Sequence, residues 1–420
     1  MQSERNNIPN KTAMKVLLVN TYNGNGGAAI AAARLAKALK SAGVDVGMLT
    51  AEDFPRRRFL VQKAWERFVV WARNGFAMKN LWTVSLANTG FDITQTSRFR
   101  EADIIHLHWV NQGFLSMKSI KNILSSGKPV VWTMHDMWPL TGICHHAGEC
   151  DGYTHGCGNC PLLRFPSGND FSAKVFSKKQ LLWHDADIRF TAVSSWLKGK
   201  AEQSALMKDC QVAVIPNMLS ADDFPLTDKQ ECRRRLNLPE GARIVAFGAA
   251  KLDDPVKGFG YLSVALSLFA PETQGTERVH LVLFGNIKGN REVFLSQIPV
   301  EYTYLGPLSH EGVVDVLNAA DVVVSSSMYE TFGQTLIEGM ACGCVPVSFD
   351  GSGQRDIILH KENGYLAKHL NTADLAAGIR WAFEAPLKRE DQRKWATDHY
   401  SQPIVAKQFI ELYETAIRVD

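Results

Sequence analysis

Short apolar runs alternate with helix-like segments in two successive series, and this alternation restricts the fold more than any other feature. Residues 14–20 (MKVLLVN) form the first run, followed by a glycine-rich turn and the alanine-rich segment 28–43. This order predicts a buried strand, a glycine loop and a helix that ends at Gly43. Further runs that predict strands occupy residues 44–50, 102–109, 128–136, 188–194, 212–217, 243–249, 280–286, 302–306, 321–327 and 344–349. Two series of strands that alternate with helices predict an α/β protein with two doubly wound domains.

The 420-residue chain divides accordingly. We expect a polar N-terminal extension (1–13), an N-terminal Rossmann-like domain (14–205), a C-terminal Rossmann-like domain (206–400) and a C-terminal helix (401–420) that packs back toward the N-terminal domain. The first residues lack the apolar core of a secretory signal, and no stretch reaches the roughly 20 apolar residues of a membrane span. We therefore expect a cytoplasmic protein. Its net charge of +3 does not call for a nucleic-acid partner, and none is expected.

Ligands of doubly wound domains bind at the carboxyl ends of the strands, so the polar residues after each strand are functional candidates. The most informative segment is 321–349 (DVVVSSSMYETFGQTLIEGMACGCVPVSF). Its strand leads into a loop with Glu330 and a helix predicted to begin near Gly333. Free N–H groups at that helix start favour a phosphate. Glu338, about one turn further, suits the hydroxyls of a ribose, and Glu330 suits those of a sugar.

Glu330 and Glu338 are separated by seven residues and are followed by GMACGCVPV. This pattern resembles the E-x7-E signature of the retaining glycosyltransferases of family 4, which have the GT-B fold. Three other segments are similar to the family: residues 24–46, residues 215–224 (IPNMLSADDF, with Met218 where the family has glycine) and residues 350–367. The resemblance implies two Rossmann-like domains that face a central cleft.

The resemblance also implies a nucleoside-diphosphate-sugar donor. Lys257 matches a family lysine that contacts the diphosphate, and Lys251 stands near the place of the family arginine; the alternative for both is a solvated surface charge. We expect catalytic roles for His135, Glu330 and Lys257. The other expected donor-site residues are Gly27, Asn217, Lys251, Thr331, Phe332, Gly333, Gln334, Thr335 and Glu338. Because lysines and backbone amides can stabilise the leaving diphosphate in this retaining transfer, no catalytic metal is expected.

Histidine and tryptophan follow two strands of the N-terminal domain, in HLHWVNQGFL (106–115) and TMHDMWPLTG (133–142). Aromatic faces pack on sugar rings, and imidazole and carboxylate groups bond hydroxyls. We expect an acceptor site that contains His108, Trp109, Asp136 and Trp138. The resemblance implies that the acceptor is a glycan or a polyprenyl-linked oligosaccharide of bacterial surface polysaccharide synthesis. A structural hydrogen bond is the alternative for each histidine, His106 included.

Residues 56–79 combine seven basic residues and one acidic residue with interleaved aromatic side chains such as Trp65 and Trp71. A basic, aromatic, amphipathic helix can lie in a membrane interface, here the inner face of the plasma membrane. The alternative is a helix that packs its apolar side on the N-terminal domain. Both interpretations stay open at this point.

The loop 142–161 contains Cys144, Cys150, Cys157 and Cys160 in the spacing C-x5-C-x6-C-x2-C. A structural zinc bound by these four thiolates is the first interpretation, because the thiols of a reducing compartment are available as ligands and the last pair has the C-x-x-C spacing of zinc sites. The other cysteines lack that spacing. His145 or His155 could replace one cysteine. Free or disulfide-linked cysteines and a redox centre are the alternatives.

Two other classes of function remain open. A nucleotide-sugar epimerase can share the GT-B fold, although the E-x7-E pattern argues against it. A non-catalytic nucleotide-sugar binding protein is the second alternative. A nicotinamide-dependent enzyme is disfavoured, because Gly24, Gly26 and Gly27 do not form G-x-G-x-x-G.

Overall fold

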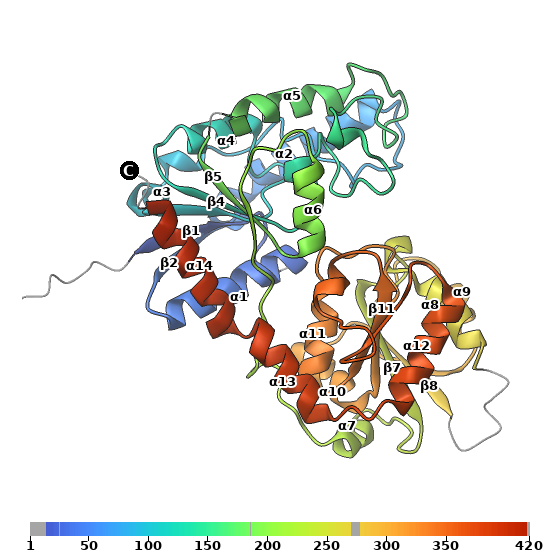
Figure 1. Ribbon diagram of the computed structural model, residues 1–420. Helices are drawn as coiled ribbons and strands as arrows, with labels where there is room; N and C mark the ends of the chain where they lie inside the picture. The colour runs from blue at the N-terminus through green and yellow to red at the C-terminus, as the bar shows by residue number, and fades with distance from the viewer. Residues whose placement is uncertain (1–13, 25, 185, 270–277, 418–420) are drawn as a thin grey trace, which may run out of the picture.

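The computed structural model describes residues 14–24, 26–184, 186–269 and 278–417. The chain forms two α/β domains, each built on a six-stranded parallel sheet (Figure 1), which confirms the predicted GT-B fold class. The expected extension 1–13 and the last three residues of the expected C-terminal helix lie outside the described residues.

The sheet of the N-terminal domain has the order β2-β1-β3-β4-β5-β6. Its strands are β1 (Lys15–Val19), β2 (Asp45–Leu49), β3 (Ile104–Leu107), β4 (Val130–Met134), β5 (Ile188–Ala192) and β6 (Val212–Val214). Strand β1 is buried from its second residue on, as its continuous apolar run requires for a strand covered on both faces. The strand order reverses between β1 and β3, and this switch point opens a crevice at the carboxyl ends of the two strands.

Helices cover both faces of this sheet. They are α1 (Gly27–Ser41), α2 (Arg56–Arg73), α3 (Ser97–Glu101), α4 (Met117–Leu124), α5 (Phe171–His184) and α6 (Ser195–Gln203). Helix α1 is rich in alanine, which favours helix formation, and it buries Leu35 and Leu39 against the sheet. The glycine loop before α1 therefore ends at a fixed place beside the crevice.

The sheet of the C-terminal domain has the order β12-β11-β10-β7-β8-β9, with its switch point between β7 and β10. Its strands are β7 (Arg243–Lys251), β8 (Val279–Asn286), β9 (Glu301–Tyr304), β10 (Val322–Ser325), β11 (Val345–Asp350) and β12 (Tyr365–Lys368). Strand β12 is not among the predicted strands; its four residues follow a turn and pair with β11 at the edge of the sheet.

The remaining helices surround this second sheet, except the last, which returns to the first domain. They are α7 (Lys229–Arg235), α8 (Phe259–Ser267), α9 (Arg291–Leu295), α10 (His310–Ala319), α11 (Gln334–Ala341), α12 (Thr372–Glu384), α13 (Arg389–Tyr400) and α14 (Gln402–Ile417). Helix α14 lies beside α1 (Figure 1), and the hydroxyl of Tyr413 is 2.6 Å from Nδ1 of His106.

The N-terminal sheet extends beyond the predicted domain boundary at 205/206. Strand β6 pairs with β5, so the sheet continues to Val214 before the chain crosses to the second domain. The short apolar run 212–217 has the same pattern as a first strand of the second series, and only the pairing assigns it to the first sheet. In the helices described for this chain, none has the length and apolarity of a membrane span.

Candidate active site

A cavity of about 370 Å³ lies at the carboxyl ends of β1, β3 and β4 in the N-terminal domain. Four of the expected site residues, Gly27, Trp109, His135 and Asp136, line it. The other lining residues are Asn20, Tyr22, Gly26, Ala28, Ala29 and His146. The rings of Tyr22 and Trp109 stack at 5.9 Å and form one wall. The cavity thus offers an aromatic face and hydroxyl-binding groups, which is the combination that a sugar ring requires.

His135 is held by a second predicted histidine. Its Nε2 lies 2.9 Å from Nδ1 of His108. Burial lowers the pKa of His135 to about 4, although the Asp136 carboxylate acts in the opposite direction. The imidazole is therefore neutral near pH 7 and has both a donor and an acceptor nitrogen. His108 is itself buried and lies behind His135, so it positions that ring and does not line the cavity.

Asp136 is a hub that fixes other side chains. Its Oδ2 accepts a hydrogen bond from Nε1 of Trp109 (2.7 Å) and pairs with Nδ1 of His145 (2.6 Å), and its Oδ1 accepts from the backbone N–H of Trp138 (2.8 Å). Burial alone raises the pKa of Asp136, but His145, through its charge and its hydrogen bond, and the other donors lower it to about 2. The carboxylate is thus ionised, and it orients Trp109 toward the cavity.

Two aromatic residues at the strand ends have structural contacts instead of a place in the cavity. Trp138, expected on the acceptor side, is 1% exposed and lies in the core, where its Nε1 donates to the carbonyl of Ser85 (2.9 Å). The 3-10 turn that contains Trp138 is buried among apolar residues, so the indole packs in the core. His106 bonds Tyr413 and Thr133 and has no open ring nitrogen.

Lys257 and Glu330 meet at the carboxyl edge of the second sheet. Nζ of Lys257 is 2.5 Å from Oε1 of Glu330, which also accepts from the hydroxyl of Ser327 (2.9 Å). Gly258, with a φ of 68°, brings the lysine loop to β10, because a Cβ there would lie 1.9 Å from the carbonyl oxygen of Ser326. Lys251 is the last residue of β7, where the register against β8 shifts. Lys251 and Lys257 thus lie at the carboxyl end of β7, beside the switch point of the sheet, where ligands of such sheets bind.

Helix α11 begins directly after this loop. Gly333, at its N-cap, has a φ of 109°, which a residue with a side chain rarely adopts, and no side chain caps the helix. The first N–H groups of α11 are therefore available to an anion. Thr331, Gln334 and Thr335 are partly exposed around this helix start. Phe332 is buried against Tyr400 at 2% exposure, so only its backbone can contact a donor.

Glu338, expected at the ribose, pairs with a residue of the other domain. Its Oε1 is 2.7 Å from Nη2 of Arg34 on α1. Nη1 of Arg34 also reaches the carbonyl of Met218 (3.5 Å), to which Gln334 donates as well (3.3 Å). Asn217, the preceding residue, is half-buried on the segment that connects the domains. Arg34 was not among the predicted site residues, because helical spacing alone does not single out one arginine on an alanine-rich helix.

The two halves of the site contact each other. The ring of His146, from the Cys-rich loop of the N-terminal domain, lies 4.5 Å from the ring of Tyr329, the neighbour of Glu330. A second link joins the backbone N–H of Ser195, at the start of α6, to Oδ2 of Asp356 (2.6 Å). The lysine–glutamate pair of one domain and the histidine-lined cavity of the other therefore belong to one site.

Besides Arg34, the polar and aromatic side chains of Asn20, Tyr22 and His146 in the cavity lining were not predicted from the sequence. Asn20 and Tyr22 directly follow β1, so the strand-end rule could have found them. His146 carries no such signal, because it lies among cysteines and reads as part of their cluster.

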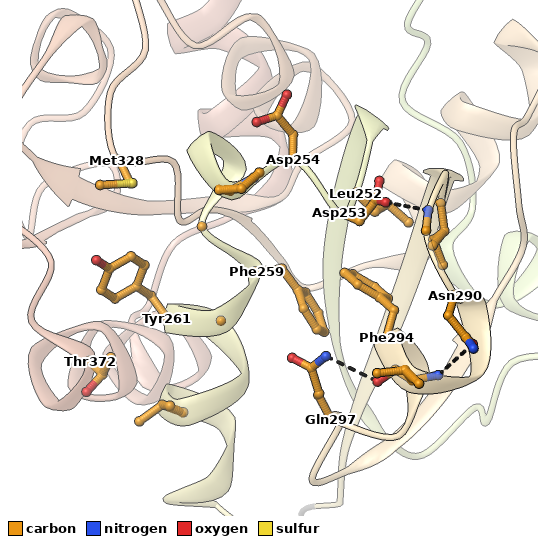
Figure 2. Close-up of a pocket in the computed structure, with 17 residues that line it drawn as sticks. Leu252, Asp253, Asp254, Phe259, Tyr261, Asn290, Phe294, Gln297, Met328 and Thr372 are labelled. Atoms are coloured by element: carbon orange, nitrogen blue, oxygen red, sulfur yellow. Dashed lines mark hydrogen bonds between the residues drawn. The ribbon is translucent and has the colours of Figure 1, made fainter. Parts of the chain in front are cut away.

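The larger cavity of the C-terminal domain, about 770 Å³, lies between the loop after β7 and helices α8 and α9. Figure 2 shows the rings of Phe259 and Phe294 next to each other among the lining residues, with the carboxylate of Asp254 pointing away from them. Among the described residues, its lining contains no lysine or arginine that could neutralise a diphosphate.

The four cysteines of the loop 142–161 are free thiols and line one small cavity of about 20 Å³. The backbone N–H of Gly142 donates to Sγ of Cys157 (3.2 Å). Burial raises the pKa of Cys144 to about 12 and that of Cys157 to about 11. Within the described ranges, no three His, Cys, Asp or Glu side chains have the arrangement that holds a metal ion. Both ring nitrogens of His145 bond Asp136 and Ser85, so it is not open as a substitute ligand.

Helix α2 packs with its polar side inward. Glu66 is buried, and its Oε1 accepts from the backbone N–H groups of Leu86 (2.6 Å) and Ala87 (3.0 Å). Buried Arg67 donates to the carbonyl of Val84 (2.9 Å). Four apolar residues of the helix face outward: Leu60, Val61, Trp65 and Phe68 are all at least half exposed, up to 61% for Val61. Val70 is buried in a cluster of the domain, and Val69 and Trp71 pack against that cluster. The alternative in which the apolar side packs on the domain therefore holds for part of the helix and not for these four exposed residues.

The chain matches models of known families over two adjoining segments. Residues 25–223 match the model described as Glycosyltransferase Family 4, and residues 228–399 match the model described as Glycosyl transferases group 1. A phosphatidyl-myo-inositol mannosyltransferase of Mycobacterium leprae is 26% identical over 344 residues, which cover 79% of this chain and 80% of that protein.

Solved structures of low sequence identity share the fold. Sucrose-phosphate synthase of Thermosynechococcus elongatus superposes with a TM-score of 0.68 at 18% identity, over 97% of this chain and 100% of that one. HepE of Anabaena, solved with UDP and glucose, gives a TM-score of 0.60 at 16% identity over 96% of this chain and 100% of that one. The two family models together match most of the sequence, and the strand ends of the two domains face each other at the site. The chain therefore belongs to family 4 of the glycosyltransferases and is an enzyme that transfers a sugar.

Proposed function

We propose that this glycosyltransferase moves a sugar, with retention of its anomeric configuration, from a nucleoside-diphosphate sugar to a hydroxyl of a glycan or a lipid-linked acceptor. One observation carries the proposal: the Lys257–Glu330 pair adjoins the histidine-lined cavity, with Tyr329 and His146 in contact between them. Cations for a diphosphate and an aromatic cavity for a sugar thus lie side by side. The complex of HepE with UDP and glucose supports the donor class.

In the proposed reaction, the bond between the anomeric carbon and the diphosphate oxygen breaks, and the acceptor oxygen bonds to the same carbon from the same face. The acceptor proton passes to the departing phosphate oxygen. Lys257, Lys251 and the free amides of α11 stabilise the charge that develops on the diphosphate. Neutral His135 bonds a hydroxyl of the sugar. Because the lysines act together with the amides of α11 on the diphosphate, we expect the proposed transfer to need no divalent metal, and a chelator should leave its rate unchanged.

In this proposal the carboxylate of Glu338 binds the hydroxyls of the ribose. Arg34 contacts only one of its carboxylate oxygens, Oε1, and so fixes the orientation of the second. A ribose hydroxyl bonded to that second oxygen would lie beside the start of α11, where the phosphates bind.

The acceptor side of the proposal involves a membrane. We propose that the outward apolar side of α2 docks on an anionic lipid surface, since exposed Trp65 and Phe68 stand among arginine and lysine side chains. Lys63, on the same helix, donates to the hydroxyl of Tyr22 in the cavity wall (2.8 Å). A lipid-linked acceptor would thus approach along a helix that touches the site. The mycobacterial relative is named for a lipid, phosphatidyl-myo-inositol, and this name supports a lipid acceptor for the present enzyme.

A structural zinc at Cys144, Cys150, Cys157 and Cys160 is also a proposal, supported by their convergence on one cavity. The thiols would have to move closer together, so we derive no step of the transfer from a metal. One equivalent of zinc in protein purified without chelators would support it, and four titratable thiols without zinc would exclude it.

Binding of UDP, GDP and ADP, followed as a rise in the melting temperature, tests the donor site. A ligand at 100 times its Kd stabilises the folded state by about 2.7 kcal/mol. We expect one nucleotide to stabilise the wild type, and Lys257→Ala and Glu338→Ala to abolish most of that rise. Lys407→Ala removes a lysine that is 78% exposed on α14 and serves as the control. Stabilisation that persists in both site variants would contradict the proposed site.

A further inference from the structure

His146 has a buried ring nitrogen without a partner. In the described part of the chain, its Nδ1 is buried and makes no hydrogen bond. The ring lines the cavity of about 370 Å³ together with His135 and Asp136. A buried polar atom without a partner costs about 1–3 kcal/mol, and buried polar groups in folded proteins are nearly always bonded. Within the described residues the ring lines the cavity with hydrogen-bonding capacity unused, which points to a ligand that occupies the cavity.

The backbone around His146 is fixed. The N–H of the preceding residue, His145, donates to the carbonyl of Thr83 (3.1 Å), and the carbonyl of His145 accepts from Met137 (2.8 Å). The side chain of His145 is tied through both ring nitrogens to Asp136 and Ser85. A site residue held on such a support keeps its geometry before the substrate arrives.

The position of His146 indicates the donor side of the cavity. Its ring packs on Tyr329 of the C-terminal domain at 4.5 Å. The charges of Glu330 and Lys257, the two expected catalytic residues of that domain, act on it together with the charge of Asp136. An imidazole nitrogen can donate or accept a hydrogen bond, which suits a hydroxyl group.

We propose that His146 is a further substrate-contacting residue of this site, whose imidazole bonds a hydroxyl of the transferred sugar where the two domains meet. This inference rests on the proposed function, because it needs a donor sugar in the cavity. It gives the Cys-rich loop a role in the reaction: the loop carries a sugar-binding histidine to the donor.

Hydrolysis of the donor without an acceptor tests the inference, because water then replaces the acceptor hydroxyl and only donor contacts matter. The probes are UDP-glucose and GDP-mannose, and the measured quantities are kcat and KM for release of free sugar, with the Kd of the matching nucleoside diphosphate. His146→Phe keeps a ring against Tyr329 but removes both nitrogens. His146→Asn keeps a hydrogen-bonding group. His155→Ala removes the exposed histidine of the same loop and is the matched control.

We expect His146→Phe to lower kcat/KM at least tenfold, His146→Asn to recover part of that loss, and His155→Ala to stay within twofold of the wild type. The Kd of the nucleoside diphosphate should stay within twofold in every variant, since it has no sugar; a purely structural role would disturb both quantities and the melting temperature. If the wild type hydrolyses a donor and both His146 variants match it, the inference is overturned while the proposed function stands. If the wild type neither binds a nucleoside diphosphate nor releases sugar, the proposed function itself fails.

Discussion

Three histidines form a buried row between helix α14 and the cavity. The rings of His106 and His108 stack at 4.2 Å, and those of His108 and His135 at 5.2 Å. Burial lowers the pKa of His106 to about 3 and that of His135 to about 4, and it holds the pKa of His108 well below its usual range. His106 and His108 are buried behind the cavity. His135, at the end of the row, lines the cavity.

The row makes the folded state sensitive to acid. Each of these histidines binds a proton more readily in the unfolded chain, near pH 6.5, than in the folded one. Stability is therefore fully present above pH 6.5 and falls as the pH drops toward 4. For His135 alone the lowered pKa corresponds to roughly 3 kcal/mol at pH 4. Thermal unfolding between pH 7.5 and 4.5 should show a falling Tm, with a shallower slope in His135→Asn. Equal slopes in the two proteins would argue against a buried neutral His135.

At the scale of elements, helix α2 packs its polar side and Val70 on the domain and leaves four large apolar side chains exposed. Replacement of Trp65 and Phe68 by serine should weaken binding to phosphatidylglycerol-containing vesicles more than tenfold, because full burial of each large apolar side chain contributes about 1.5–3 kcal/mol. Flotation with vesicles measures this binding. Leu268→Ser, an exposed apolar position of the C-terminal domain, is the control. Wild-type protein that stays at the bottom of the gradient with anionic vesicles contradicts the membrane role of α2.

The sequence predicts most of the strands, because a continuous apolar run has few alternatives to a buried parallel strand, and it misses the edge strand β12. It does not predict the orientation of α2. Glu66 and Arg67 satisfy backbone groups of a loop about 20 residues away, and periodicity cannot show which side such contacts will bury. The assignment of β6 to the first sheet depends on its pairing with β5, which the sequence does not show. His146 reaches the site because the Cys-rich loop folds back over the cavity, and this too is not visible in the sequence.

At the scale of the whole molecule, few side chains join the two domains near the site, and Arg34–Glu338 is the most buried ion pair among them in the described residues, with 14% of each side chain exposed. Loss of this pair should let the domains part. Arg34→Gln is expected to raise the radius of gyration in small-angle X-ray scattering and to weaken nucleotide binding several-fold. Lys37→Gln, on the same helix, removes an exposed pair with Asp223 at 3.3 Å and should change neither quantity, since exposed pairs contribute little. Identical scattering from both variants would show that Arg34 does not hold the domains together.

The anomeric form of the sugar first released from UDP-glucose or GDP-mannose tests the central claim most directly. Both donors carry an α-linked sugar, and proton NMR distinguishes the α and β anomers of the product before they equilibrate. A retaining transfer to water at the site formed by His135, Lys257 and Glu330 predicts that the α anomer appears first, and that Lys257→Ala releases it at least tenfold more slowly. The β anomer as first product, or α-anomer release at an unchanged rate in Lys257→Ala, would contradict the account.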